Sequence, residues 1–80
     1  MKNKQIQVTR KGFEELSAEL TELVEVKRPK VVERLERARQ EGDLSENSDY
    51  TNSKEELEFL DGRIDELKHV VDNATVIDDS

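Results

Sequence analysis

The chain has 80 residues, of which only 32% are hydrophobic, so it can form one domain at most and cannot build a globular core of ordinary size. Charged residues make up 41% of the sequence and the net charge is −7, which argues against non-specific binding of duplex nucleic acid by the whole surface. The absence of cysteine excludes disulfides and cysteine-based zinc sites. No apolar run approaches the ~18 residues of a membrane span, and no secretory signal is visible. These features predict a soluble, cytoplasmic protein.

The first half of the chain predicts a short extended lead-in and one long helix. Residues 1–8 are partly apolar, with Ile6 and Val8 alternating with glutamines. Thr9 is the predicted N-cap, because its hydroxyl can accept an N–H of the first turn. The helix is expected over about 10–41. Pro29 lies inside it and predicts a kink, since proline removes a backbone hydrogen bond and crowds the preceding turn.

The second half predicts a turn and a second helix. Gly42 fits the left-handed position that ends a helix. The tip is placed at residues 42–45 and the second helix at about 46–73, with Asp43 as its cap and Ser45 as the competing cap. Residues 74–80 are interpreted as the start of a linker to a C-terminal domain that this chain lacks. Their apolar residues have no expected partner except the lead-in strand.

Two apolar stripes indicate how the helices pair. Both advance in steps of three and four residues, as in a coiled-coil seam. Paired antiparallel, residues of the two stripes have numbers that add up to 87 or 88, so the chain folds back near residue 44. The sequence therefore predicts an all-α, monomeric, antiparallel coiled-coil hairpin. The predicted seam positions are Phe13, Leu16, Leu20, Val24, Lys27, Val31, Leu35 and Ala38 against Tyr50, Ser53, Leu57, Leu60, Ile64, Leu67, Val71 and Ala74.

Asp43 and Glu46 are the candidate metal ligands, because they lie at the end of a slender hairpin with no core to support. Carboxylate oxygens suit Mg²⁺, which usually takes one or two protein carboxylates and leaves its other positions to water and phosphate. Two carboxylates alone hold Mg²⁺ weakly, so a partner would have to complete the site. The alternative is that the two residues form a capping box and do nothing more.

A few basic residues lie near the tip of this acidic chain: Arg34, Arg37, Arg39 and Lys54. They form either a small electrostatic site for a phosphate backbone or a solvated helix face with pairs such as Glu33–Arg37. His69 is expected at the surface, because a single imidazole seldom binds metal without partners. Gly62 falls on the outward face of the second helix, where no packing reason for glycine is evident.

Residues 42–50, which read GDLSENSDY, resemble the tip motif of the bacterial Gre-type transcript-cleavage factors. The likeness covers essentially the whole chain and includes residues 27–29, 62–64 and 73–78. The tip motif is specific, whereas the leucine pattern is not. Residues 51–53 depart from the family by replacing an alanine-rich segment, which bears on helix stability.

The resemblance implies an N-terminal coiled coil that enters the secondary channel of bacterial RNA polymerase. Asp43 and Glu46 then help hold a second Mg²⁺, bound only in the complex, and the polymerase cuts its own backtracked RNA. Arg39 and Lys54 match basic positions that contact the 3′ end of that RNA. The chain is thus expected to assist an enzyme without being one.

Three alternatives stay open at the level of sequence. An inhibitory relative that occupies the same channel would keep the hairpin and alter the tip, and the intact tip carboxylates argue against it. A purely structural coiled-coil module predicts neutral tip substitutions. An RNA-binding helical arm should be basic, which the net charge of −7 disfavours.

Overall fold

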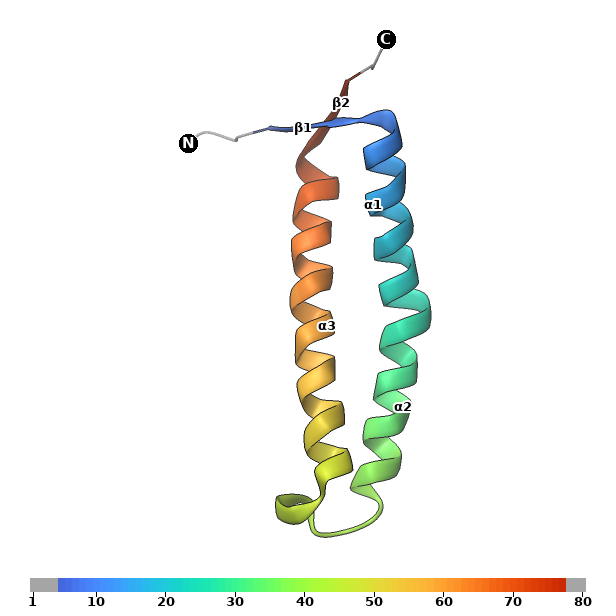
Figure 1. Cartoon of the computed structure of the whole chain (residues 1–80), viewed down its shortest axis with the longest axis vertical. Coiled ribbons are helices and arrows are strands. Elements are labelled where there is room, and N and C mark those ends of the chain that lie inside the picture. Colours follow the sequence, from blue (N-terminus) through green and yellow to red (C-terminus); the bar gives the residue numbers. More distant parts are fainter. Residues whose placement is uncertain (1–4, 78–80) are drawn as a thin grey trace.

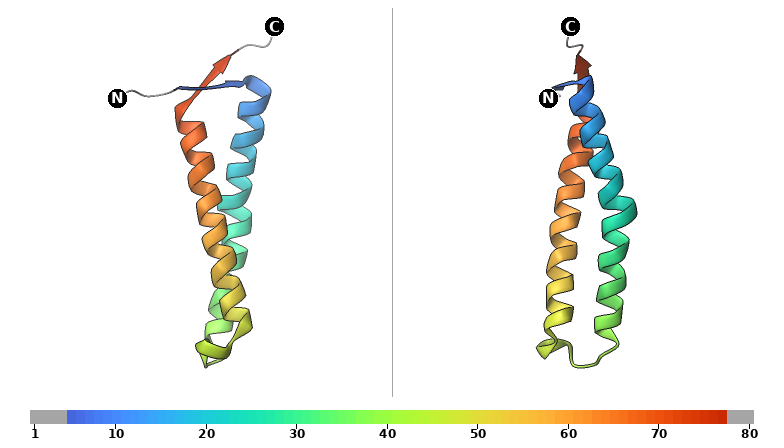
Figure 2. Two further views of the ribbon diagram at one scale, coloured as in Figure 1. Left: turned by 60° about the vertical axis from the view of Figure 1, so that its left-hand side comes forward. Right: turned by 45° about the vertical axis from the view of Figure 1, so that its right-hand side comes forward.

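Two helical arms lie side by side and antiparallel in the computed structural model, which describes residues 5–77. The hairpin measures 56 × 28 × 13 Å, and the views in Figures 1 and 2 show the arms together along their whole length. The predicted all-α hairpin is confirmed. None of the helices within residues 5–77 is long and apolar enough to cross a membrane. The elements in order are β1 (Ile6–Thr9), α1 (Arg10–Glu22), a π-helical turn (Leu23–Lys27), α2 (Arg28–Arg39), a 3₁₀ turn (Leu44–Glu46), α3 (Ser48–Asn73) and β2 (Ala74–Ile77).

The first arm begins as predicted and is interrupted earlier than predicted. The N–H of Gly12 donates to Thr9 Oγ1 at 3.0 Å, which confirms the N-cap. The irregularity expected at Pro29 is a π turn that precedes it, where the N–H of Arg28 reaches back five residues to the carbonyl of Leu23. Proline crowds the carbonyl four residues earlier, and a wider turn at this place accommodates it. The arm bows outward at this level (Figure 2).

The π turn changes which residues face the second arm. Leu23 is buried, whereas Val24, the predicted seam residue, is 43% exposed. Beyond the turn Arg28 is half-buried, and Lys27, also predicted in the seam, is exposed. The prediction was wrong at these two positions because a π turn accommodates one extra residue, which rotates the following residues relative to a continuous α-helix. The inward stripe is therefore Leu16, Leu20, Leu23, Arg28, Val31, Leu35 and Ala38.

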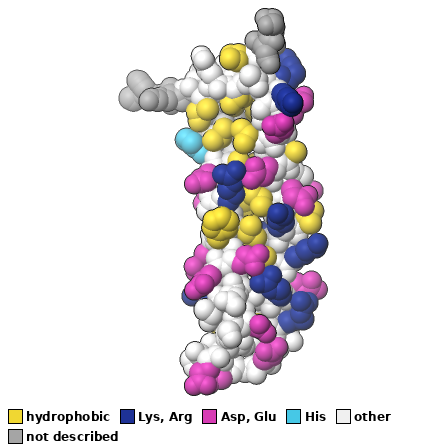
Figure 3. All heavy atoms as spheres, in the orientation of Figure 1, with side chains coloured by type: hydrophobic (Ala, Val, Ile, Leu, Met, Phe, Trp, Pro, Cys, Tyr) yellow, Lys and Arg dark blue, Asp and Glu magenta, His cyan; other side chains and the backbone are white. Residues whose placement is uncertain are grey.

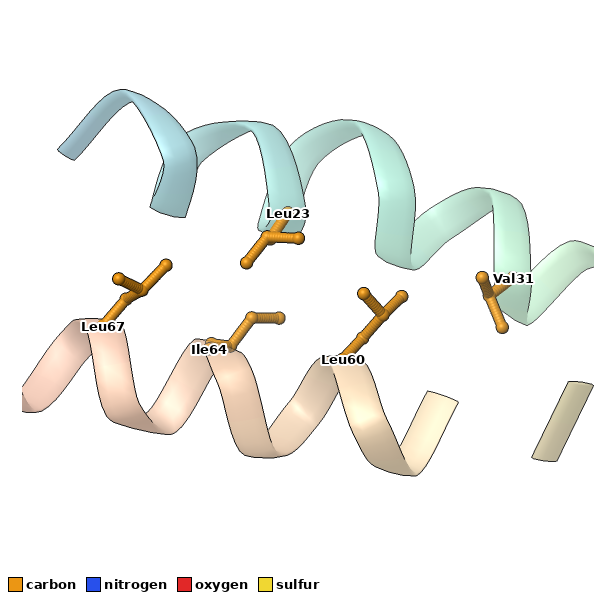
Figure 4. Packing of buried hydrophobic residues seen from close by; sticks show 5 residues of the cluster. All are labelled: Leu23, Val31, Leu60, Ile64 and Leu67. Atoms are coloured by element: carbon orange, nitrogen blue, oxygen red, sulfur yellow. The ribbon is translucent and has the colours of Figure 1, made fainter. Parts of the chain in front are cut away.

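The core is a single line of side chains between the arms. Leu23 and Val31 of the first arm point toward Leu60, Ile64 and Leu67 of α3 (Figure 4). Leucine residues of both arms, partly buried, pack against this cluster. Nearer the closed end the buried residues are small, Ala38 and Ser53, which allows the helices to approach closely. The apolar core thus ends before the tip is reached.

Ion pairs connect the edges of the two arms. Asp61 accepts from Arg28 Nε at 2.7 Å, Glu56 from Arg34 at 2.8 Å, and Glu19 from Arg63 at 3.0 Å. The hydrogen bond and charge of Asp61 raise the pKa of Arg28 above its usual value. A raised pKa on a base means that the interaction of Arg28 with the ionised Asp61 contributes its full stability below the ordinary arginine pKa and is lost as the pH rises above it.

The second arm starts later than predicted, at Ser48 instead of residue 46, and ends at Asn73. The side-chain amide of Asn73 donates to the carbonyl of His69 at 2.8 Å and so caps the last turn. His69 lies at the surface, as expected. Residues 74–77, predicted as linker, form β2, while residues 78–80 lie outside the described residues.

A short parallel ribbon closes the open end of the hairpin. β1 pairs with β2 in the register Ile6↔Ala74 to Thr9↔Ile77. The two strands cross above the helices (Figure 1). The predicted partnership between the lead-in and the apolar residues after the second helix is confirmed for residues 6–9, whereas residues 1–4 lie outside the described residues. Since parallel strands need a crossover connection, the whole hairpin serves as that connection.

Candidate functional site at the hairpin tip

Residues 40–47, called the tip loop below, connect α2 to α3 at the closed end. Gly42 has a φ of +110°, a conformation that side chains disfavour, so the predicted glycine stop is confirmed. The N–H groups of Glu41 and Gly42 donate to the carbonyls of Ala38 and Arg39, which satisfies the end of α2. The chain then makes the 3₁₀ turn before α3 begins.

Asn47 fixes the tip loop to both helices. Its Oδ1 accepts the N–H of Tyr50 at 3.1 Å, which caps α3, and its Nδ2 donates to the carbonyl of Ala38 at 2.8 Å, at the end of α2. The amide of asparagine offers an acceptor and a donor on two separate atoms of one short side chain. Asn47 was missed from the sequence, where Asp43 and Ser45 were weighed as caps. The available signal was that asparagine is among the best N-cap residues.

Asp43 caps the 3₁₀ turn instead of α3. Its Oδ1 accepts from the N–H of Ser45 at 3.1 Å and from the Ser45 hydroxyl at 2.8 Å. Within residues 5–77 nothing donates to its Oδ2, and the side chain of Glu46 makes no hydrogen bond or ion pair. The predicted capping box on the second helix is therefore wrong, because the 3₁₀ turn separates both residues from the start of α3.

The surface around these carboxylates is acidic and open. A shallow hollow of about 380 Å³ is lined by Glu41, Asp43, Glu46, Asn47, Ser48 and Asp49. No described lysine or arginine pairs with its four carboxylates. At the closed end of the face in Figure 3 the coloured side chains are acidic. Mutual repulsion of these charges makes the hollow attractive to a cation.

The donor set fits a shared Mg²⁺ better than a complete site. Asp43 and Glu46 supply hard carboxylate oxygens on an exposed turn, which Mg²⁺ accepts. Among the described residues no three acidic or histidine side chains are grouped so that they could hold a metal by themselves. Binding of Mg²⁺ by these two carboxylates would therefore need further oxygen ligands from another molecule.

The predicted RNA-contacting residues lie on the helices that flank the tip loop. Arg39 ends α2 and pairs with Glu36 at 3.7 Å, and Lys54 pairs with Glu58 at 4.0 Å. Both pairs are long and exposed, so they are weak. Of the other two basic residues near the tip, Arg34 bridges the arms, and Arg37 makes the expected pair with Glu33 at 3.6 Å.

Fold and tip together define an antiparallel helical-hairpin arm with an acidic closed end. Comparison with known proteins is consistent with that class. Residues 6–76 match the GreA/GreB family described as "Transcription elongation factor, N-terminal", and the chain belongs to this family.

Two relatives illustrate the match. The chain is 49% identical over 77 residues to transcription elongation factor GreA of Staphylococcus carnosus (strain TM300), covering 96% of the chain and 48% of the relative. It is 48% identical over 77 residues to the protein of the same name from Staphylococcus aureus (strain JH9), covering 96% and 49%. The chain thus spans about half the length of the curated relatives it matches.

Proposed function

We propose that this chain is the arm of a transcription elongation factor that enters the secondary channel of bacterial RNA polymerase. There its tip stimulates cleavage of backtracked RNA by the polymerase. The observation that carries the proposal is the state of Asp43 and Glu46, which lie exposed at the closed end, where no described lysine or arginine pairs with either carboxylate. The names of the relatives, transcription elongation factor GreA, support it. A cytoplasmic location follows from this role.

The shape of the hairpin suits insertion. Helix α3 has 26 residues, so it extends about 39 Å at 1.5 Å per residue. The Cα atoms extend over 56 Å along the longest axis and 13 Å along the shortest, so the hairpin is long and thin. A narrow rod of this length carries its tip far from any part of the factor that rests outside a channel.

The tip carboxylates complete a metal site in this proposal. A second Mg²⁺, when bound, stabilises the attacking and leaving oxygens of phosphodiester hydrolysis. Asp43 and Glu46 hold it from one side, and Asn47 keeps the tip loop in place between the two helices. Arg39 and Lys54 release their weak glutamate partners and bind the phosphates near the 3′ end of the RNA. The chain is not an enzyme by itself, because the polymerase supplies the other ligands and the substrate.

The test uses isosteric tip variants in stalled elongation complexes. The chain is tested alone at high concentration, and within the Staphylococcus carnosus relative in place of the matched segment. Asp43→Asn and Glu46→Gln remove one charge each and keep side-chain size. Loss of transcript cleavage is expected, with unchanged circular dichroism melts and unchanged polymerase binding. Glu41→Gln, which removes a charge from the same hollow, is the matched control and should cleave nearly normally.

Two further results bear on the proposal. Arg39→Ala and Lys54→Ala should reduce cleavage at low factor concentration and leave some at high concentration. The isolated chain should bind Mg²⁺ only weakly in calorimetry and should not cleave RNA alone. Normal cleavage by the Asp43→Asn, Glu46→Gln double variant would overturn the proposal in favour of a purely structural hairpin, and tight Mg²⁺ binding by the chain alone would contradict the shared site.

A further inference from the structure

The outer face of α3 carries an apolar residue that the fold does not use. Phe59 is 73% exposed, more than any other large hydrophobic residue described. It borders a hollow of about 430 Å³, whose other lining residues are Glu58, Gly62, Arg63 and Glu66. An exposed aromatic side chain beside a hollow offers a stacking surface to a partner.

Gly62 keeps the floor of this hollow open. It lies in mid-helix, and its φ is not positive, so its backbone does not require glycine. A Cβ built on it meets no atom within 4 Å, so packing inside the chain does not require glycine either. Glycine weakens a helix relative to alanine. The presence of glycine at position 62 is explained if another molecule approaches the helix backbone at this point.

The charges around the hollow indicate what that molecule carries. Arg63 is held by Glu19 of the other arm at 3.0 Å and by Glu66 at 3.4 Å, so its charge is already neutralised. Glu58 has only a contact of 4.0 Å with Lys54. The rim of the hollow is therefore acidic overall. It repels the phosphates of RNA, and it repels a second copy of a chain with a net charge of −7.

We propose that this hollow, defined by Phe59, Gly62, Glu58 and Glu66, docks a basic side chain of the polymerase channel wall, most simply an arginine. The guanidinium stacks on the ring of Phe59 over Gly62 and donates to Glu58. This inference rests on the proposed function. Phe59 is 13 residues beyond Glu46, or about 20 Å along the arm, so a tip at the active centre places the hollow against the channel.

The first test separates binding from stability. Gly62→Ala fills the hollow and strengthens the helix, and Phe59→Ala removes the stacking surface. Each should weaken the affinity of the chain for bacterial core RNA polymerase about fivefold to tenfold, the effect of truncating a contributing interface residue. The melting temperature should be unchanged or, for Gly62→Ala, higher. Val26→Ala, which removes an exposed apolar side chain from the first arm, is the matched control and should bind normally.

The second test identifies the partner. Replacing Phe59 by the photoreactive p-benzoylphenylalanine should cross-link the chain to a polymerase peptide that contains arginine or lysine. Glu58→Lys should weaken binding more than Glu58→Gln. Cross-links to RNA or to a second copy of the chain would overturn the proposal, and so would unchanged affinity in both Gly62→Ala and Phe59→Ala.

The docking site and the role of the tip can be refuted separately. If Gly62→Ala and Phe59→Ala bind normally while Asp43→Asn and Glu46→Gln lose cleavage, the docking site is refuted and the proposed function stands. If the first pair loses affinity while the tip variants cleave normally, the docking site stands and the cleavage role is refuted. At saturating concentration the hollow variants should recover full cleavage, because the chemistry at the tip is intact.

Discussion

The shaft of the hairpin and its tip loop are held by different forces. In the shaft, Leu23, Ile64 and Leu67 are buried between the arms, and ion pairs lie along the edges. The tip loop has no buried apolar residue, and Leu44 is 38% exposed. Its shape depends on the two hydrogen bonds of Asn47 and on the backbone of Gly42.

This difference separates stability from chemistry. Burial of apolar surface in the shaft supplies the free energy of folding, and no proposed functional side chain takes part in it. The tip carboxylates contribute little to folding and are free to meet a cation. Substitutions in the shaft should therefore change melting, whereas substitutions of the tip carboxylates should change activity with small changes in melting.

The largest effect on stability is expected from Leu67→Ala. Leu67 is 2% exposed, and truncating a core leucine costs about 2–5 kcal/mol. Urea unfolding followed by circular dichroism measures the loss. Val24→Ala is the matched control and should change the free energy of unfolding by less than about 0.5 kcal/mol, because Val24 points outward. Equal losses in the two variants would show that Val24 and not Leu23 belongs to the seam.

Asn47 gives the next largest effect. Asn47→Ala removes the cap of α3 and the bond to α2, and should cost about 1–2 kcal/mol. Asn47→Asp keeps an acceptor for the N–H of Tyr50 but cannot donate to Ala38. Its melting should lie between those of the alanine variant and the unaltered chain. Faster amide exchange confined to residues 40–50 would accompany both changes, and wild-type exchange in Asn47→Asp would show that the bond to Ala38 is unimportant.

Gly42→Ala tests the turn itself. A side chain at a φ of +110° is strained although the space around it is free, and left-handed backbone costs a non-glycine residue about 1–2 kcal/mol. Thermal melts should show a modest loss, and cleavage in the polymerase assay should fall because the strained turn displaces Asp43. Gly62→Ala, where φ is helical, is the control and should melt at the same or a higher temperature.

Glu46→Gln should have the smallest effect on stability. Glu46 is exposed and makes no hydrogen bond or ion pair within residues 5–77. Its replacement should change the free energy of unfolding by no more than about 0.5 kcal/mol. A loss comparable to that of Asn47→Ala would show that the Glu46 side chain supports the tip loop, and it would weaken the assignment of Glu46 to metal binding.

Much of the fold follows from the sequence alone. The spacing of leucines in two stripes fixes the two helices and their antiparallel pairing, because each helix must bury one face. Thr9 and Gly42 mark helix ends through properties of their own side chains and backbone. The positions of Asp43 and Glu46 at the closed end follow from the same turn. The apolar residues after the second helix had one possible partner, the lead-in strand, and β2 pairs with that strand, β1.

Only the tertiary structure decided the details that depend on contacts between the arms. Leu23 replaces Val24 in the core because a π turn before Pro29 takes up one residue, and periodicity within a single helix cannot reveal such a turn. Asn47, and not Asp43 or Ser45, caps α3, because its amide also donates to the carbonyl of Ala38. Several side chains near the turn could cap α3. Which of them does so depends on the position of α2, and no local sequence pattern specifies that position.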